Sequence, residues 1–290
     1  MSNTSHPSAR FKAPNSILSG SPLKNLLDRK LIALIAESFT HAHQEFDANR
    51  FQKTANLGLD EHELVGRGLH IARALAAHLP EDFPKASKIL IASFGPELSK
   101  TDKNGLAPFY YLPHAHYIAT YGLEHPADGL RANYELTKRF TAEFSIRPYL
   151  IKHEQVTLKQ LKAWTRDKNP HVRRLVSEGT RPRLPWASRL PKFQKEPAPV
   201  LELLELLKDD PELYVRRSVA NNIGDIAKDH WDVALKVCKT WLEEVDGFKD
   251  NERSQARCWI IRHAVRLPAQ KGVKEALKLR KMAGGKGPNL

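Results

Sequence analysis

The strongest constraint on the fold is a repeat in the second half of the chain. The segment NPHVRRLVSEGT matches DPELYVRRSVANNIGD, and alignment of their Val-Arg-Arg triplets places Arg174 on Arg217, 43 residues later. Two weaker copies, LTKRFTAEFSIR and CWIIRHAVR, place Arg139 and Arg262 at the same position of further units. Repeats of about 35–45 residues, each able to form a helix pair, are typical of HEAT-like α-solenoids. The repeat therefore predicts stacked helix pairs.

The rest of the chain also carries helical patterns. In SPLKNLLDRKLIALIAESFTHAH, a serine cap and Pro22 precede apolar residues at three- and four-residue spacing. No stretch shows the sustained alternation of a half-buried strand. We predict an all-α fold, a HEAT-like repeat α-solenoid whose second helices line a concave face. It should span 22–280, between a disordered N-terminal tail at 1–21 and a flexible C-terminal tail at 281–290.

Composition indicates a protein of the reducing cytoplasm. No apolar run reaches 18 residues, and the N-terminus lacks the apolar core of a signal peptide. The two cysteines, Cys238 and Cys258, form no CxxC motif. The HxH pairs at 41–43 and 114–116 have no carboxylate or thiol cluster nearby in sequence. We expect a monomer in the cytoplasm, with no membrane partner, no metal and no cofactor.

Positive charge is concentrated in one part of the chain. The net charge is +13, and residues 131–196 hold 16 lysines and arginines against 6 acidic residues. The natural partners of so basic a surface are nucleic acids or anionic membranes. Because this segment coincides with the repeats, we expect a basic DNA-binding face on the concave side.

The repeat alignment also places acidic residues on that basic face. The equivalent arginines of successive units would form a ladder along stacked second helices: Arg139, Arg174, Arg217 and Arg262. One helical turn after them stand Glu143, Glu178, Asn221 and Arg266, and Asp225 lies one turn beyond Asn221. Such pairs can be ordinary i,i+4 ion pairs worth a few tenths of a kcal/mol. A surface built only for phosphate would nevertheless exclude carboxylates, because they repel it.

A proline-rich segment, RPRLPWASRLPKF, follows Glu178. Its prolines cannot continue a helix, so we predict an extended loop that presents cationic side chains. Trp186 in this loop can be either a core anchor or an exposed stacking surface whose π-face attracts cations. The arginines that we expect to contact phosphates here are Arg181, Arg183 and Arg189.

Carboxylates and an indole among phosphate-binding arginines fit a DNA substrate that carries a cationic, alkylated base. Alkylation at a ring nitrogen charges a purine and weakens its N-glycosidic bond. A carboxylate can then stabilise the oxocarbenium-like sugar and orient water, as in glycoside hydrolysis. Two alternatives stay open: a non-catalytic nucleic-acid-binding solenoid, for which the carboxylates have no use, and a protein-interaction scaffold.

The chain resembles the AlkC-type bacterial alkylpurine DNA glycosylases, in the HEAT-like superfamily that also contains AlkD. The matching stretches include HIARALAAHLPEDFPKA, FTAEFSIRP, HVRRLVSEGTRPRLPWA and YVRRSVANNIGDIAKDH, and the resemblance covers roughly 22–280. It implies double-stranded DNA as partner and hydrolytic release of cationic N-alkylated bases, chiefly 3-methyladenine, without full flipping of the lesion. Some relatives carry a C-terminal immunoglobulin-like domain, which we expect to be absent here because the chain ends in MAGGKGPNL.

The resemblance implies four catalytic-site residues by motif: Glu143, Glu178, Trp186 and Asp225. Glu178 would position water and stabilise the oxocarbenium-like sugar, and the other two carboxylates would add negative field. Trp186 would pack against the deoxyribose or the cationic base. The arginines expected to hold DNA are Arg139, Arg174, Arg181, Arg183, Arg189, Arg217 and Arg262.

Overall fold

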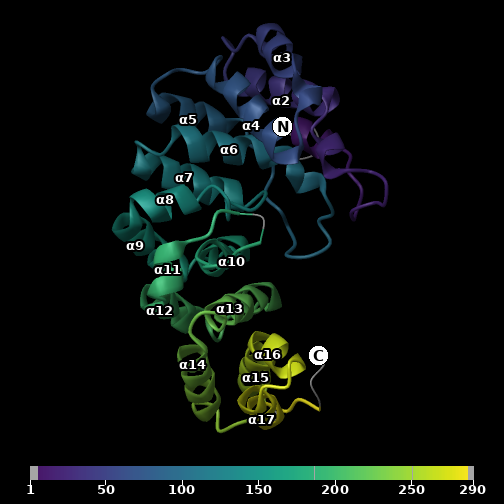
Figure 1. Cartoon of the computed structure of the whole chain (residues 1–290). Coiled ribbons are helices and arrows are strands. Elements are labelled where there is room, and N and C mark those ends of the chain that lie inside the picture. Colours follow the sequence, from purple (N-terminus) through teal and green to yellow (C-terminus); the bar gives the residue numbers. More distant parts are fainter. Residues whose placement is uncertain (1–5, 186, 250, 287–290) are drawn as a thin grey trace. The chain divides into compact units, whose positions relative to one another are not determined.

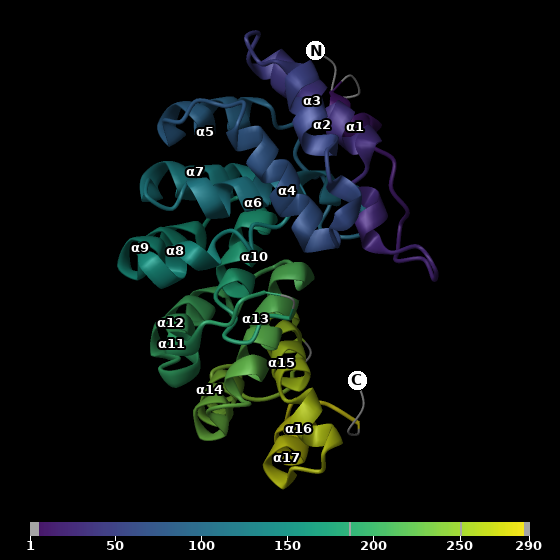
Figure 2. The ribbon, with the colours of Figure 1, turned by 45° about the horizontal axis from the view of Figure 1, so that its top comes forward.

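The computed structural model describes residues 6–185, 187–249 and 251–286, and within these ranges all regular structure is helical (Figures 1 and 2). The predicted all-α fold is confirmed. The helices group into two compact units, Met1–Thr157 (unit 1) and Leu158–Leu290 (unit 2). The boundary falls within α9 (Glu154–Trp164).

Unit 1 packs its helices in neighbouring pairs: α4 lies against α6, α2 against α3, and α5 against α7. Part of the range predicted as a disordered tail forms the short helix α1, which packs on α2. The helical pattern that follows is divided at Asp28, whose Oδ1 accepts a 2.8 Å hydrogen bond from the amide of Leu31 and so caps α2. The elements are α1 (Pro7–Arg10), η1 (Leu23–Leu26), α2 (Arg29–Ala42), α3 (Ala48–Asn56), η2 (Leu59–Glu61), α4 (Leu64–Ala76), α5 (Phe83–Ala92), η3 (Ala107–Tyr111), α6 (Leu112–Tyr121), α7 (Pro126–Thr137) and α8 (Arg147–Lys152).

Unit 2 contains the repeat. Three helices, α10, α13 and α15, pack side by side, and α12 and α14 lie against them (Figures 1 and 2). Arg174, Arg217 and Arg262 fall on these three successive helices, as the repeat alignment predicts. The elements are α10 (Pro170–Gly179), α11 (Pro191–Lys195), α12 (Ala198–Leu207), α13 (Leu213–Ile226), α14 (Trp231–Glu243), α15 (Glu252–Ala264), α16 (Arg266–Gln270) and α17 (Lys274–Met282).

The first two residues of the Val-Arg-Arg triplet have equivalent packing and hydrogen bonds in both copies. Val172 and Val215 are fully buried between helices. Arg173 Nη1 donates to the carbonyls of residues 167 and 168 at 2.9 and 3.1 Å, and Arg216 Nη1 donates to those of residues 210 and 211 at 2.8 and 2.7 Å. Each arginine thereby fixes the turn before its own helix. The second arginine of each triplet, Arg174 or Arg217, is left for the helix surface.

Helices α10, α13 and α15 form one layer, and prolines set where the two outer helices, α10 and α15, end. A proline ring clashes with the carbonyl four residues earlier, which is Glu178 for Pro182 and Ala264 for Pro268. Accordingly, α10 ends at Gly179 and α15 ends at Ala264. The break after α15 separates it from α16, so Arg266 is not on the helix that carries Arg262.

The layer formed by α10, α13 and α15 is held by buried apolar side chains. Val176, Val219 and Ile261 are each fully buried, and burial of each such side chain contributes about 1.5–3 kcal/mol. Gly224 lets α13 approach α15 closely, because a Cβ there would lie 3.1 Å from the carbonyl oxygen of Ala264. Helices α10, α13 and α15 therefore form a closely packed platform for the side chains on their shared surface.

Candidate functional site

Two of the predicted carboxylates meet through one arginine in unit 2. Glu178 lies at the C-terminal end of α10 and Asp225 at that of α13. Arg181 Nη1 donates to Glu178 Oε1 at 2.7 Å, and Arg181 Nε donates to Asp225 Oδ2 at 2.8 Å. The side chains of Glu178, Arg181 and Asp225 are only 6%, 11% and 2% exposed, so these ion pairs are shielded from water. We call these three residues the carboxylate bridge.

Further polar groups hold Glu178 in its charged form. Ser218 Oγ donates to Glu178 Oε2 at 2.6 Å, and Arg174 Nη2 lies 3.4 Å from Oε1. Burial alone disfavours the carboxylate, but the charges of Arg174 and Arg181 outweigh burial and lower the pKa of Glu178. Glu178 is therefore ionised at neutral pH despite its position among packed helices.

The immediate surroundings of the carboxylate bridge are net positive. Lys228 Nζ lies 2.8 Å from Asp225 Oδ1, so Asp225 has a cation on each oxygen. Together with Arg174, Arg181 and Lys228 bring three positive charges to the two carboxylates of the bridge. Arg174 also lies over the ring of Tyr214, 5.2 Å from its centroid. Because the cations outnumber the carboxylates, this arrangement attracts an anion.

A hydroxyl and amide network behind the bridge was not predicted from the sequence. Ser177 Oγ donates to Ser218 Oγ at 2.7 Å, and Asn222 Nδ2 donates to the carbonyl of Ser177 at 2.8 Å. All three residues are buried. Polar residues on an otherwise apolar helix face are the signal that would have indicated them. The network fixes α10 relative to α13 and so fixes the carboxylates.

The absence of helix predicted for the proline-rich segment is confirmed for its described residues between Gly179 and Pro191. The prediction that this segment presents Arg181 is wrong, because the Arg181 side chain is only 11% exposed. Arg183 makes a two-point ion pair with Asp229, with Nε 2.7 Å from Oδ2. Arg189 is exposed. Trp186, predicted to contact sugar or base, lies outside the described residues.

The helical spacing predicted for Arg139 and Glu143 is wrong. In unit 1, α7 ends at Thr137, so both residues lie in the turn before α8. Arg139 Nε donates to the carbonyl of Gly95 at 2.6 Å, and its Nη1 lies 3.1 Å from Glu135 Oε2. Arg139 is therefore held by groups of the preceding segments and lies beyond the end of α7. Glu143 instead accepts a 2.7 Å hydrogen bond from Thr141.

The remaining two ladder arginines lie on neighbouring helices but have different contacts. Arg217 is exposed on α13, and no ion pair is recorded for it in the described part of the chain. Arg262 on α15 donates to the carbonyl of Ala283, and Arg280 donates to the carbonyl of Arg262 at 2.9 Å. Arg262 therefore joins α15 to the segment that follows α17.

Two comparisons place the chain among known proteins, while no family model matches it. It is 36% identical over 258 residues to the uncharacterized protein YhaZ of Bacillus subtilis (strain 168), covering 89% of this chain and 67% of that protein. It is 35% identical to Pseudomonas fluorescens alkylpurine DNA glycosylase AlkC, solved bound to DNA containing an abasic site analog. That match has a TM-score of 0.78 and covers 90% of this chain and 68% of AlkC.

The chain belongs to the AlkC family. The resemblance inferred from the sequence motifs is thereby confirmed. Of the four residues that we expected at the catalytic site, three fall within the described residues. Glu178 and Asp225 are joined in the carboxylate bridge, and Glu143 lies in unit 1.

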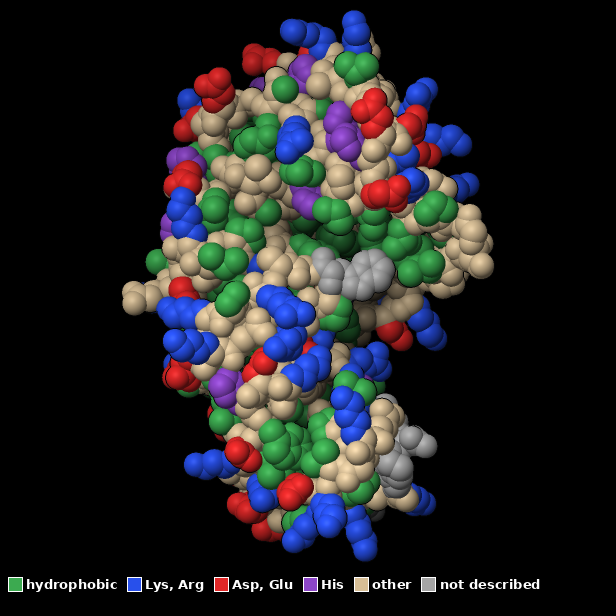
Figure 3. Space-filling view, in the orientation of Figure 1, with side chains coloured by type: hydrophobic (Ala, Val, Ile, Leu, Met, Phe, Trp, Pro, Cys, Tyr) green, Lys and Arg blue, Asp and Glu red, His purple; other side chains and the backbone are tan. Residues whose placement is uncertain are grey.

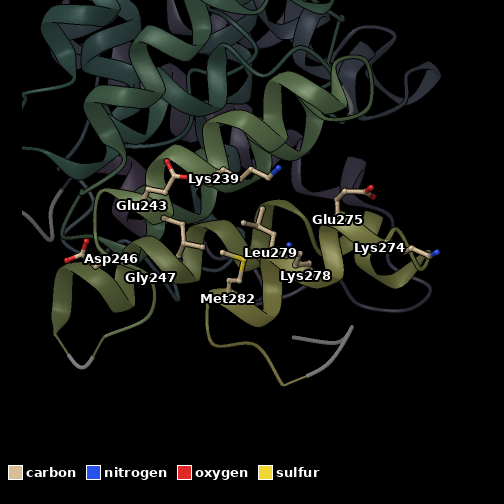
Figure 4. A pocket seen from close by; sticks show the side chains of 10 residues that line it. Lys239, Glu243, Asp246, Gly247, Lys274, Glu275, Lys278, Leu279 and Met282 are labelled. Atoms are coloured by element: carbon tan, nitrogen blue, oxygen red, sulfur yellow. The ribbon is translucent and has the colours of Figure 1, made fainter.

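Other surface features of this AlkC-family chain are less suited to a site. A cavity of about 1020 Å³ between α14 and α17 is lined by three lysines and three acidic residues around Leu242, Leu279 and Met282, so its charges balance (Figure 4). Lysines and arginines gather instead on the part of unit 2 that holds α10 to α13 (Figure 3). Within the described ranges, no cluster of side chains suits a metal ion, and no helix is long and apolar enough to cross a membrane.

Proposed function

We propose that the protein is a monofunctional DNA glycosylase that hydrolyses the N-glycosidic bond of cationic, N-alkylated bases, chiefly 3-methyladenine. One observation gives this proposal its main support. In a chain of the AlkC family, a carboxylate that its neighbours keep ionised, Glu178, stands among cations on a helix platform. The proposed partner is double-stranded DNA in the cytoplasm, bound by a monomer.

The proposed chemistry needs no group beyond the chain and water. The bond between C1′ and the base breaks, and its electron pair neutralises the positive charge of the alkylated ring. The sugar becomes oxocarbenium-like, and Glu178 stabilises that charge. Water then adds to C1′, and its proton passes through the carboxylate to solvent. Glu143 and Asp225 would add negative field, and Trp186 would pack against the sugar or the base.

The carboxylate bridge sets a condition on this mechanism. Because three cations face Glu178 and Asp225, their combined field would repel a cationic base in the absence of DNA. Backbone phosphates compete with the carboxylates for the same guanidiniums. We propose that phosphates draw Arg174 and Arg181 toward DNA, so that the charge of Glu178 and Asp225 becomes available to the substrate only in the complex.

The same contacts favour one alternative function. If Arg181 keeps both carboxylates in the complex, the bridge is a structural clamp. The protein is then a non-catalytic nucleic-acid-binding solenoid. Base release separates the two functions, since only the glycosylase frees a base.

The test is incubation with methylated DNA followed by chromatography of the released bases. Wild type should release 3-methyladenine, and Glu178→Gln should release none while binding intact duplex at least as well. Glu202→Gln is the matched control, because Glu202 is exposed on α12 and its closest cation is 4.0 Å away. No release by wild type would contradict the glycosylase, whereas release by Glu178→Gln at the wild-type rate would contradict only the role of Glu178. Thermal unfolding of each variant shows that it is folded.

A further inference from the structure

A cluster of hydrogen-bond donors that forms no ion pair with the described residues lies between α13 and α16. Asn221 Oδ1 accepts from Arg266 Nη2 at 3.1 Å and lies 3.1 Å from His263 Nε2. Arg266 Nη1 also donates to the carbonyl of His263 at 2.6 Å. Arg217 stands one helical turn before Asn221 on α13. We call Arg217, Asn221 and Arg266 the donor cluster.

The donor cluster carries positive charge that no ion pair within the described part of the chain neutralises. Arg217 and Arg266 form no ion pair among the described residues, whereas Arg174 and Arg183 each form one and Arg181 forms two. The pKa of Arg266 is lowered by burial and by the nearby charge of Arg181, despite an opposing effect of Asp225. Burial and the charges of Arg266 and Arg217 also lower the pKa of His263 to about 4, so this ring is neutral at physiological pH.

The donor types of the cluster suit an oxyanion. Asn221 Oδ1, its only side-chain acceptor, is engaged by Arg266, which leaves the Nδ2 amide as a donor. His263 is held in place by stacking on Trp259, with ring centroids 4.8 Å apart and planes at 13°. Two guanidiniums and one amide on packed helices form a donor set of the kind that binds a phosphate.

We infer that the donor cluster binds a backbone phosphate of DNA, one repeat beyond the carboxylate bridge. This inference rests on the proposed function. It assigns the phosphate contact of the third repeat to Arg266. Arg262, which the repeat alignment selects, has its guanidinium on the carbonyl of Ala283. The helix is interrupted at Val265, between α15 and α16, and Arg266 lies beside Asn221. Arg266 can therefore take the role that the alignment gives to Arg262.

The test is the salt dependence of binding to an undamaged duplex, measured by fluorescence anisotropy. Loss of one phosphate contact lowers the slope of log K against log salt by about 0.9. We expect this loss for both Arg266→Ala and Arg217→Ala. Lys236→Ala on α14 is the matched control, because Lys236 is exposed on a helix outside the platform. Its slope should equal that of wild type.

Two further variants keep the test decisive if Arg266→Ala loses structure. Arg217 is exposed, so its replacement leaves packing intact. Asn221→Asp places a carboxylate beside Arg266 without a change of size, and it should weaken binding more than tenfold at low salt. Unchanged slopes for Arg217→Ala and Arg266→Ala would overturn the inference, as would a reduced slope for Arg262→Ala alone. Because the duplex is undamaged, the result is independent of base release, which tests the proposed function separately.

Discussion

Replacement of Arg181 tests whether the carboxylate bridge is a stabilising ion pair. In Arg181→Met the side-chain volume is nearly kept, but Glu178 and Asp225 lose their shared cation. All three side chains are at most 11% exposed, so the loss follows the rule for buried pairs and not that for surface pairs. Removal of one partner from a buried pair costs about 3–5 kcal/mol of unfolding free energy. Lys228 and Arg174 remain near the carboxylates, so we expect the lower end of that range.

The pH dependence of this loss identifies its cause. The pKa of Glu178 is lowered in the folded protein because the charges of Arg174 and Arg181 outweigh burial. A lowered pKa contributes stability above the unfolded value of about 4.3, and this stability is lost as pH falls through the folded value. The difference between wild type and Arg181→Met should therefore be largest at neutral pH and shrink below about pH 4.

Urea unfolding at pH 7 and at pH 3.5 measures both quantities. Arg181→Met/Asp225→Asn serves as the second variant, because it removes one of the two stranded charges and should recover part of the loss. An equal difference at the two pH values, or no recovery in the double variant, would refute an electrostatic role for Arg181. Lost packing of its aliphatic stem would then be the explanation.

Two other substitutions test the support of the site. Ser218→Ala removes the 2.6 Å hydrogen bond to Glu178 Oε2 and should cost about 1–3 kcal/mol in urea unfolding; a loss below the error of the measurement would show that this bond contributes no net stability. Gly224→Ala places a methyl group 3.1 Å from the carbonyl oxygen of Ala264 and should cost about 1–3 kcal/mol through strain between α13 and α15. An unchanged melting temperature for that variant would mean that the helices separate freely.

The sequence by itself determined the helical architecture and the register of the two strongest copies of the repeat. The Val-Arg-Arg triplets aligned Arg174 with Arg217, and these residues fall on α10 and α13 of one packed layer. Proline positions set the loop after Glu178, because a proline cannot continue a helix. These features are local or periodic, and such features can be read along a chain. The family motifs were recognisable for the same reason.

Tertiary structure alone decided which charges from distant parts of the sequence meet. Arg181 and Asp225 are 44 residues apart, and their 2.8 Å contact depends on how α10 packs against α13. Arg139 donates to the carbonyl of Gly95, 44 residues before it, and lies beyond the end of α7, outside the helical register that the sequence suggested. Because α15 ends at Ala264, the arginine that bonds to Asn221 is Arg266, and not the Arg262 that the alignment selects. The i,i+4 pair of Arg174 and Glu178 could be read from spacing along one helix. The partners of Arg139, Arg181 and Arg266 depend instead on packing between separate segments, which no spacing within one helix encodes.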